Sequence, residues 1–178
     1  MVLSCGALIG RSDLFELAKL RNCVIHVPSG AIIGLDGLMA ASQGYIYSVT
    51  ITTRKPPEGL KGSPGQRASD IDLDTITEPV QLFEGSVAEG FKLFPANVNV
   101  AAAISMAGIG PERTRICVLA DPGIRRNIHE VTVDGDFGTV QFRIENIPSD
   151  DNPRTGRITL LSMVAYLKQM VSPVHIGI

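Results

Sequence analysis

Residues 127–146 read NIHEVTVDGDFGTVQFRIEN, which predicts two antiparallel strands joined by a tight turn. The letters DGDFG in the middle supply the small and polar residues that hairpin turns require. In the first strand, His129 alternates onto the same face as Val131 and Val133, the face expected to meet the core. Because its imidazole titrates near neutral pH, His129 is our first candidate for acid–base chemistry. The alternative is a hydrogen-bonded structural residue at the end of a strand.

Alternating and helical spacing of apolar residues predicts further elements around this hairpin. Strands are predicted at residues 47–57, 79–85, 115–121, 127–135 and 138–146. Helices are predicted at residues 35–44, 86–94, 95–111 and 155–171, and a surface loop at 58–70. Ser86 and Glu89 form a capping box at the start of one helix. We expect residues 35–178 to form an α+β domain, with an antiparallel or mixed sheet and helices on one face.

The final predicted helix is amphipathic. Its apolar side chains recur at helical spacing and should face one way. They are Ile158, Leu161, Val164, Ala165 and Val171.

The first 34 residues show a different pattern from the rest. Apolar runs at 2–9 and 23–30 predict two strands, and residues 11–22 predict a helix between them. Strand, helix and strand make a βαβ unit of a parallel sheet, which needs cover on both faces and more strands than these two. We therefore expect residues 1–34 to be the last part of a doubly wound, Rossmann-type domain.

The composition indicates a soluble globular protein, with 44% hydrophobic residues, 19% charged residues and a net charge of -2. No basic stripe suggests nucleic acid as a partner. The longest charge-free apolar stretch, 98–109, is too short to cross a bilayer, and no secretory signal opens the chain. Cys5, Cys23 and Cys117 lie far apart and are expected to be small buried hydrophobes, with no metal-ligand spacing. We expect a cytoplasmic protein without membrane or nucleic-acid partners.

Two asparagines and a glycine-rich segment are further candidates for binding. Asn97 and Asn99 open the charge-free helix 95–111, where unpaired N–H groups could hold a carboxylate or an amide; simple helix capping is the alternative. The glycines of residues 28–37 could let the backbone approach a ligand, or could serve only a turn. Several cations could bind substrate carboxylates or could be solvated surface charges. They are Arg54, Lys55, Arg125, Arg126 and Arg154.

Several long stretches together resemble the L-aspartate dehydrogenases. They are HVPSGAIIGLDG (26–37), VTITTRKPP (49–57), LFEGSVAEGFKLFPANVNVAAA (82–103), DPGIRRNIHEVTVDGDFG (121–138) and IENIPSDDNPRTGRIT (144–159). The resemblance runs in order from about residue 2 to the C-terminus. It implies an enzyme that uses NAD or NADP to interconvert L-aspartate with iminoaspartate, or with oxaloacetate and ammonia. It also implies a link to NAD biosynthesis and a homodimer.

The resemblance implies roles for three residues. His129 matches the histidine of the family's N-x-H-E stretch and would be the catalytic acid–base. Ala31, in the S-G-A segment, and Asn99, the second asparagine of N-V-N-V, would contact the cofactor. Residues 35–178 would be the catalytic and dimerisation domain.

The family's dinucleotide fingerprint belongs to a segment that precedes residue 2, and it is absent from this sequence. We therefore expect an N-terminal Rossmann half as a partner, and weak NAD(H) affinity for the chain alone. Two other functions stay open. One is a non-catalytic dimerisation or regulatory fragment; the other is a related oxidoreductase that acts on another amino or hydroxy acid.

Overall fold

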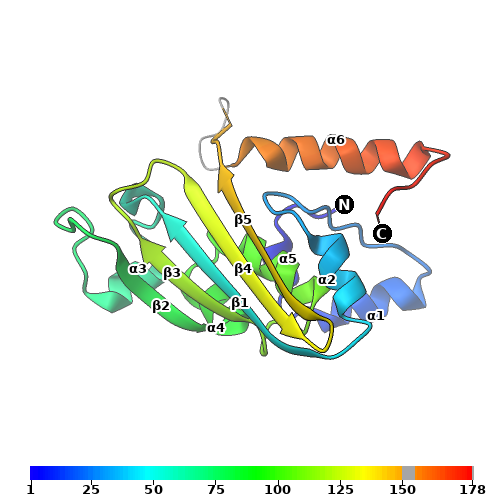
Figure 1. The fold of residues 1–178 in the computed structure, drawn as a ribbon, viewed down its shortest axis with the longest axis horizontal. Helices are drawn as coiled ribbons and strands as arrows, with labels where there is room; N and C mark the ends of the chain where they lie inside the picture. The colour runs from blue at the N-terminus through cyan, green and yellow to red at the C-terminus, as the bar shows by residue number, and fades with distance from the viewer. Residues whose placement is uncertain (150–154, 178) are drawn as a thin grey trace.

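The structure, a computed structural model, describes residues 1–149 and 155–177 (Figure 1). It consists of a twisted sheet, a layer of helices behind the sheet, and a long C-terminal helix set apart from both. No helix among these residues is long and apolar enough to cross a membrane.

The sheet has five strands in the order β2-β3-β1-β4-β5. The strands are β1 (Ile46–Lys55), β2 (Val80–Ser86), β3 (Arg115–Ala120), β4 (Asn127–Gly135) and β5 (Gly138–Asn146). The central strand β1 runs parallel to β3, and every other neighbouring pair is antiparallel. The sheet is therefore mixed, and the predicted α+β fold is confirmed.

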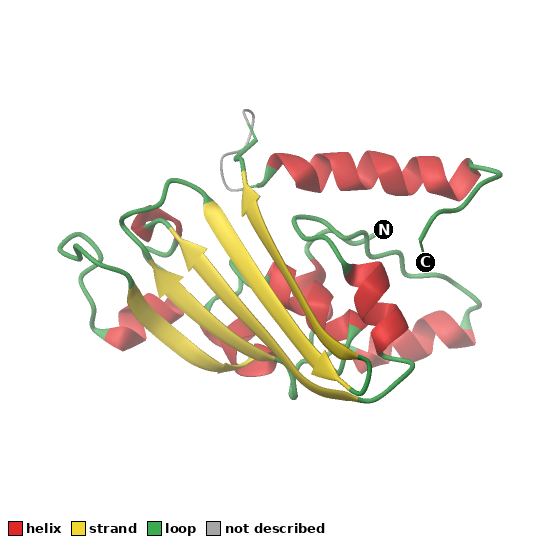
Figure 2. Cartoon of the chain, viewed as in Figure 1, coloured by secondary structure: helices red, strands yellow, loops and turns green. Residues whose placement is uncertain are grey.

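Helices cover one face of this sheet (Figure 2). In chain order the helical elements are η1 (Cys5–Leu8), α1 (Ser12–Leu20), α2 (Leu35–Ala41), η2 (Pro57–Gly59), α3 (Pro64–Ser69), α4 (Val87–Leu93), α5 (Asn99–Ala107) and α6 (Arg157–Val171). The predicted capping box is present at the start of α4: Ser86 Oγ accepts from the Glu89 N–H, and the Glu89 carboxylate accepts from the Ser86 N–H. Helix α5 is mostly buried, as its lack of charge predicts.

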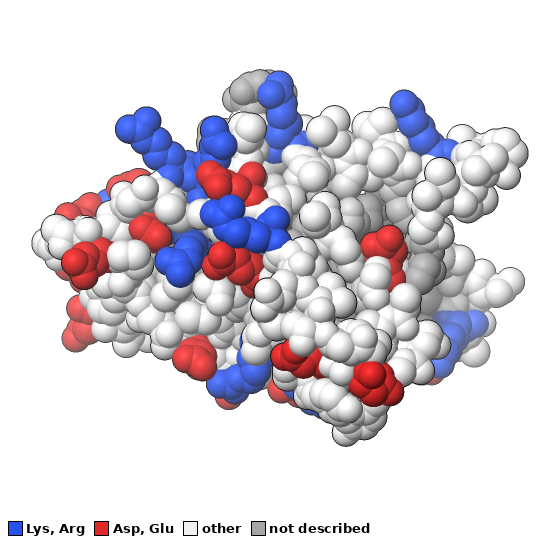
Figure 3. Space-filling view, viewed as in Figure 1, with Lys and Arg blue, Asp and Glu red and all other residues white. Residues whose placement is uncertain are grey.

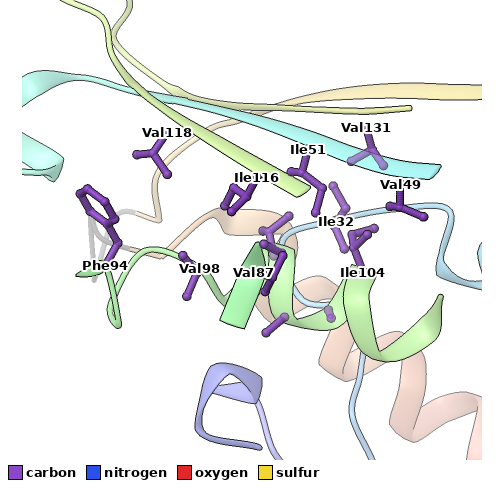
Figure 4. Close-up of a cluster of buried hydrophobic side chains, with 14 of the residues drawn as sticks. Ile32, Val49, Ile51, Val87, Phe94, Val98, Ile104, Ile116, Val118 and Val131 are labelled. Atoms are coloured by element: carbon purple, nitrogen blue, oxygen red, sulfur yellow. The ribbon is translucent and has the colours of Figure 1, made fainter. Parts of the chain in front are cut away.

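The core lies between the sheet and helices α4 and α5 (Figure 4). Alternate residues of the strands point to it, so Ile51, Val131 and Ile116 are almost fully buried. Ile104 of α5 and Phe94, at the end of α4, meet them from the helical side. This side of the sheet is called the covered face below.

The opposite side of the sheet, called the open face below, carries charges of both signs (Figure 3). Arg143 lies 3.4 Å from Glu130 and 3.3 Å from Glu145, and Arg54 lies 3.7 Å from Glu130. These pairs are substantially exposed to solvent, so each contributes little to stability.

Two predicted strands are wrong. Residues 5–8 form the 3-10 helix η1, and residues 23–29 have no regular structure, although α1 between them is confirmed. A single backbone hydrogen bond, from Val2 N to His26 O, links the two segments. Within the described residues no strand lies beside either segment, so neither has the partner that a strand needs, and Cys23 and Val24 are exposed instead of buried. The assignment of residues 1–34 to a Rossmann domain stays a prediction.

The predicted surface loop at 58–70 is wrong in part, because it contains most of η2 and all of α3. Ser63 caps α3 through a hydrogen bond to the Gln66 N–H, and Pro64 takes the first helical position. The cysteine prediction holds for Cys5, which is buried, but is wrong for Cys23, which is exposed.

Helix α6 is present as predicted, but its apolar face does not join the core. Leu161, Val164 and Val171 are all more than half exposed. The helix follows β5 and lies beside the sheet, not on it (Figure 1). One contact that holds it is a hydrogen bond of 2.6 Å between Tyr166 Oη and His26 Nδ1.

Candidate active site

A cleft of about 340 Å³ lies at the edge of the covered face where β1 ends and β4 begins. Segments far apart in the sequence line it. They are residues 3–5, 28–31, 96–100, 127–129 and 155–160, together with single residues at the ends of β1 and β5. No lining residue that the structure describes is an aspartate or a glutamate.

His129 lies on this cleft and is 3% exposed. Strand pairing places it directly opposite Thr53 of β1, and the Thr53 hydroxyl is hydrogen-bonded to its Nδ1 at 3.1 Å. Nε2 has no hydrogen-bond partner among the described residues. Burial, and then the nearby charge of Lys55, lower the pKa of His129 to about 3. The imidazole is therefore neutral at neutral pH.

Lys55, the last residue of β1, lies on the same cleft and is 8% exposed. Its Nζ donates a hydrogen bond of 2.7 Å to Asn97 Oδ1. Burial lowers its pKa to about 8, so at neutral pH the ammonium is still largely charged. No carboxylate in the described part of the chain pairs with it, which makes Lys55 a buried charge with a neutral partner.

Ala31 and Asn99 also line the cleft. Asn99 is the first residue of α5; its Oδ1 accepts from Gly6 N at 3.0 Å, while its Nδ2 has no partner in residues 1–149 and 155–177. The Ala31 carbonyl accepts from Asn146 Nδ2 at 3.1 Å. Gly30, just before Ala31, has a φ of +66°, a conformation that favours glycine. The structure thus brings His129, Ala31 and Asn99 together on one cleft.

Two helix N-termini reach the same cleft. Asn99 and Val100 begin α5, and Gly156 is the residue that precedes α6. Neither helix has a side-chain cap: Val98 and Gly156 stand at the two capping positions. The partial positive charge of both helix starts adds to that of Lys55. The cleft is consequently suited to an anion.

Three of the other candidate cations do not line this cleft. Arg54 points to the open face, where it pairs with Asp121 and Glu130. Arg126 lies 3.8 Å from Glu145 and is half exposed, Arg125 is exposed, and Arg154 lies outside the described residues.

Sequence reasoning named Lys55 only as one of five unranked cations, and it gave Thr53 no role. Strict alternation along β1, with Val49 and Ile51 inside, already places both on the covered face. Asn127 and Asn146, which face each other across β4 and β5, were also missed. Among the described residues, no group of three or more His, Cys, Asp or Glu side chains could hold a metal ion.

Comparisons with known proteins agree with one another. A family model described as "Aspartate dehydrogenase, C-terminal" matches residues 36–170. The L-aspartate dehydrogenase of Methanosarcina barkeri is 53% identical over 180 residues, which cover 99% of this chain and 66% of that protein. The L-aspartate dehydrogenase of Bradyrhizobium diazoefficiens is 48% identical, with 99% and 63% covered.

A solved structure gives the same result for the fold. The crystal structure of aspartate dehydrogenase from Thermotoga maritima superposes with a TM-score of 0.77 at 32% identity, over 98% of this chain and 66% of that one. The chain thus spans just under two thirds of the length of these relatives. Because the family model and relatives half identical to it cover most or all of its residues, this chain belongs to the aspartate dehydrogenase family.

Proposed function

We propose that this chain is the catalytic part of an NAD(P)-dependent L-aspartate dehydrogenase. The reaction interconverts L-aspartate with iminoaspartate, which exchanges with oxaloacetate and ammonia. The observation that carries the proposal is a neutral histidine beside a buried, charged lysine on a cleft whose described lining holds no carboxylate. A dicarboxylic amino acid is complementary to such a cleft, and relatives that cover the whole chain bear the name L-aspartate dehydrogenase.

His129 is the acid–base residue in this proposal. A general base must be neutral and must reach the proton that it removes. Burial keeps the imidazole neutral, and the bond to Thr53 holds Nδ1, so Nε2 is the atom that would act. Nε2 would accept a proton from the water that attacks the imine carbon, and would return a proton to the leaving amine. In the reverse direction the same atom handles the same protons.

Ala31 and Asn99 would hold the dinucleotide, which supplies the hydride acceptor when bound. The donor set fits such a group: within the described residues Asn99 Nδ2 has no partner, and Gly30 leaves the backbone beside Ala31 without a side chain. We further propose that residues 1–34 adjoin a Rossmann domain that corresponds to the part of the relatives not matched here. A homodimer, a cytoplasmic location and a link to NAD biosynthesis complete the proposal.

The first test is turnover by the complete protein with L-aspartate, L-homoserine and L-malate, each with NAD and with NADP. We expect oxidation of L-aspartate to be the fastest reaction, followed as reduced nicotinamide absorbance. Faster turnover of homoserine or malate would assign a different oxidoreductase activity. No turnover of any substrate would favour a non-catalytic role.

The second test is the substitution His129→Ala. Loss of a general acid–base group should lower kcat by about 100- to 10,000-fold. Cofactor affinity should change little, because Ala31 and Asn99 are intact. His175→Ala is the matched control, since His175 is exposed and does not line the cleft. Equal kcat in the two variants would remove His129 from the mechanism.

A further inference from the structure

We propose that Lys55 is the residue that binds a carboxylate of the substrate, beside His129. The inference rests on the proposed function and deepens it, because it selects one cation among the five that the sequence offers. It also assigns the anion-binding side of the cleft to the end of β1.

The backbone places Lys55 on the cleft and holds it there. Lys55 follows Thr53 by two residues in β1, so both side chains point to the covered face. The Lys55 carbonyl accepts a hydrogen bond of 2.9 Å from Asp121 N at the point where the strand ends. Thr53 is hydrogen-bonded to His129, so β1 positions both the imidazole, through Thr53, and the ammonium of Lys55 two residues later.

The charge of Lys55 is not compensated within the described protein. Its partner, Asn97 Oδ1, is a neutral oxygen, and the described cleft lining holds no acid. Burying an ammonium without a counter-charge costs free energy, which a carboxylate ligand would recover through a charge-assisted hydrogen bond. The same carboxylate would offset the repulsion between the ammonium and a protonated His129. The arrangement is therefore unfavourable when empty and favourable when a carboxylate binds.

A second positive feature on the cleft is a helix N-terminus. Helix α6 has 15 residues and no side-chain cap, and Gly156 and Thr159 at its start line the cleft. Two N–H groups of this first turn, those of Arg157 and Thr159, are already bonded to backbone carbonyls. The partial charge of this helix start can bind an anion, and here it acts together with the buried ammonium. Lys55 and the starts of α5 and α6 give the cleft more than one positive feature, which suits a ligand with two carboxylates.

The test is calorimetric binding of succinate, a dicarboxylate that cannot be oxidised at an amino group, with and without NADH. It compares the complete wild-type protein with its Lys55→Met and Lys92→Met variants. Methionine keeps most of the length of lysine without its charge, and Lys92 is an exposed lysine of the adjacent helix α4. Loss of a charged hydrogen bond should weaken succinate binding about 10- to 100-fold in Lys55→Met only. Lys55→Arg should retain part of the binding.

Steady-state kinetics distinguish a role of Lys55 in substrate binding from a purely structural role. In Lys55→Met, KM for L-aspartate should rise by at least about 10-fold, while KM for the nicotinamide cofactor stays the same. Unchanged succinate affinity, or an equal loss in Lys92→Met, would overturn the inference. If Lys55→Met does not fold, Lys55→Gln replaces it in both measurements. Succinate binding needs no turnover, so failure of the inference is distinguishable from failure of the proposed enzyme activity.

Discussion

Arg54 and Lys55 are neighbours in β1, yet they lie in opposite environments. Arg54 reaches the open face, is about one third exposed and lies near two carboxylates, those of Asp121 and Glu130. Lys55 reaches the covered face and is almost fully buried, and the partner that its ammonium has among the described side chains is a neutral amide oxygen, that of Asn97. The fold therefore gives one of two adjacent cations solvent and counter-charges, and gives the other neither.

The difference separates charges that are paired in contact with water from buried charges that can do chemistry. On the open face, ion pairs such as Arg143–Glu130 are exposed to water and are weak. On the covered face, His129 and Lys55 lie where the helical layer stops and the cleft begins. There, desolvation shifts the pKa values of His129 and Lys55. A strongly shifted pKa in a cleft is a mark of a functional site.

The largest expected effect comes from the apolar part of the covered face. Phe94 is fully buried, and its ring packs against Phe83 at a centroid distance of 6.2 Å. Phe94→Ala should lower the free energy of unfolding by about 3–5 kcal/mol. Phe137→Ala, in the exposed turn of the hairpin, should cost less than about 1 kcal/mol. Urea denaturation checks both, and similar losses would contradict the contrast between buried and exposed sites.

A smaller effect should appear on acidification. Folding lowers the pKa of His129 from 6.5 to about 3, first by burial and then through Lys55. Between these values the unfolded chain binds a proton that the folded chain does not bind. Stability is thus lost as pH falls, by at most about 1.4 kcal/mol per pH unit. His129→Gln should remove this part of the pH dependence, whereas His175→Gln should not. Denaturation curves between neutral pH and about pH 5 give the slopes.

The smallest expected effect is a gain. Folding lowers the pKa of Lys55 from 10.5 to about 8, so at neutral pH the buried charge opposes folding. Lys55→Met should raise the free energy of unfolding by about 1–3 kcal/mol at neutral pH. The gain should shrink above about pH 8, where wild-type Lys55 loses its proton in the folded state. Arg54→Met should change stability by less than about 1 kcal/mol. A loss in Lys55→Met would show that the ammonium supports the fold.

Most of the sheet could be predicted because alternation is a local signal. Val131 and Val133, for example, are buried exactly on the pattern that the sequence shows, and the capping box at Ser86 was visible from two residues. The segments 2–9 and 23–30 could not be assigned in this way. A short apolar run does not show which strands, if any, lie beside a segment, nor that the whole segment is buried: Cys23 and Val24 are exposed. The exposure of the apolar side chains of α6 could not be predicted for a related reason. An amphipathic pattern shows that a helix has an apolar face, but not whether another element packs against that face.

The site required more than local pattern. His129 was visible as a polar residue on an apolar strand face, and Asn99 as a residue at a helix start, but the cofactor roles of Ala31 and Asn99 came only from resemblance to a family. The cleft is lined by residues that are more than a hundred positions apart in the sequence. No local pattern predicts that such distant residues lie close together in the fold. Lys55 was within reach of the alternation argument, yet a lysine at a strand end is more often solvated.

The way the cleft is assembled has a consequence for the whole chain. Residue 5, the start of β4 and the first turn of α6 all line it, so a molecule that fills the cleft would contact the first segment, the sheet and the last helix described here. Such a molecule would fasten the first segment and the last helix to the sheet together. Protease cleavage in the first segment and in α6 should therefore slow together when the cleft is filled.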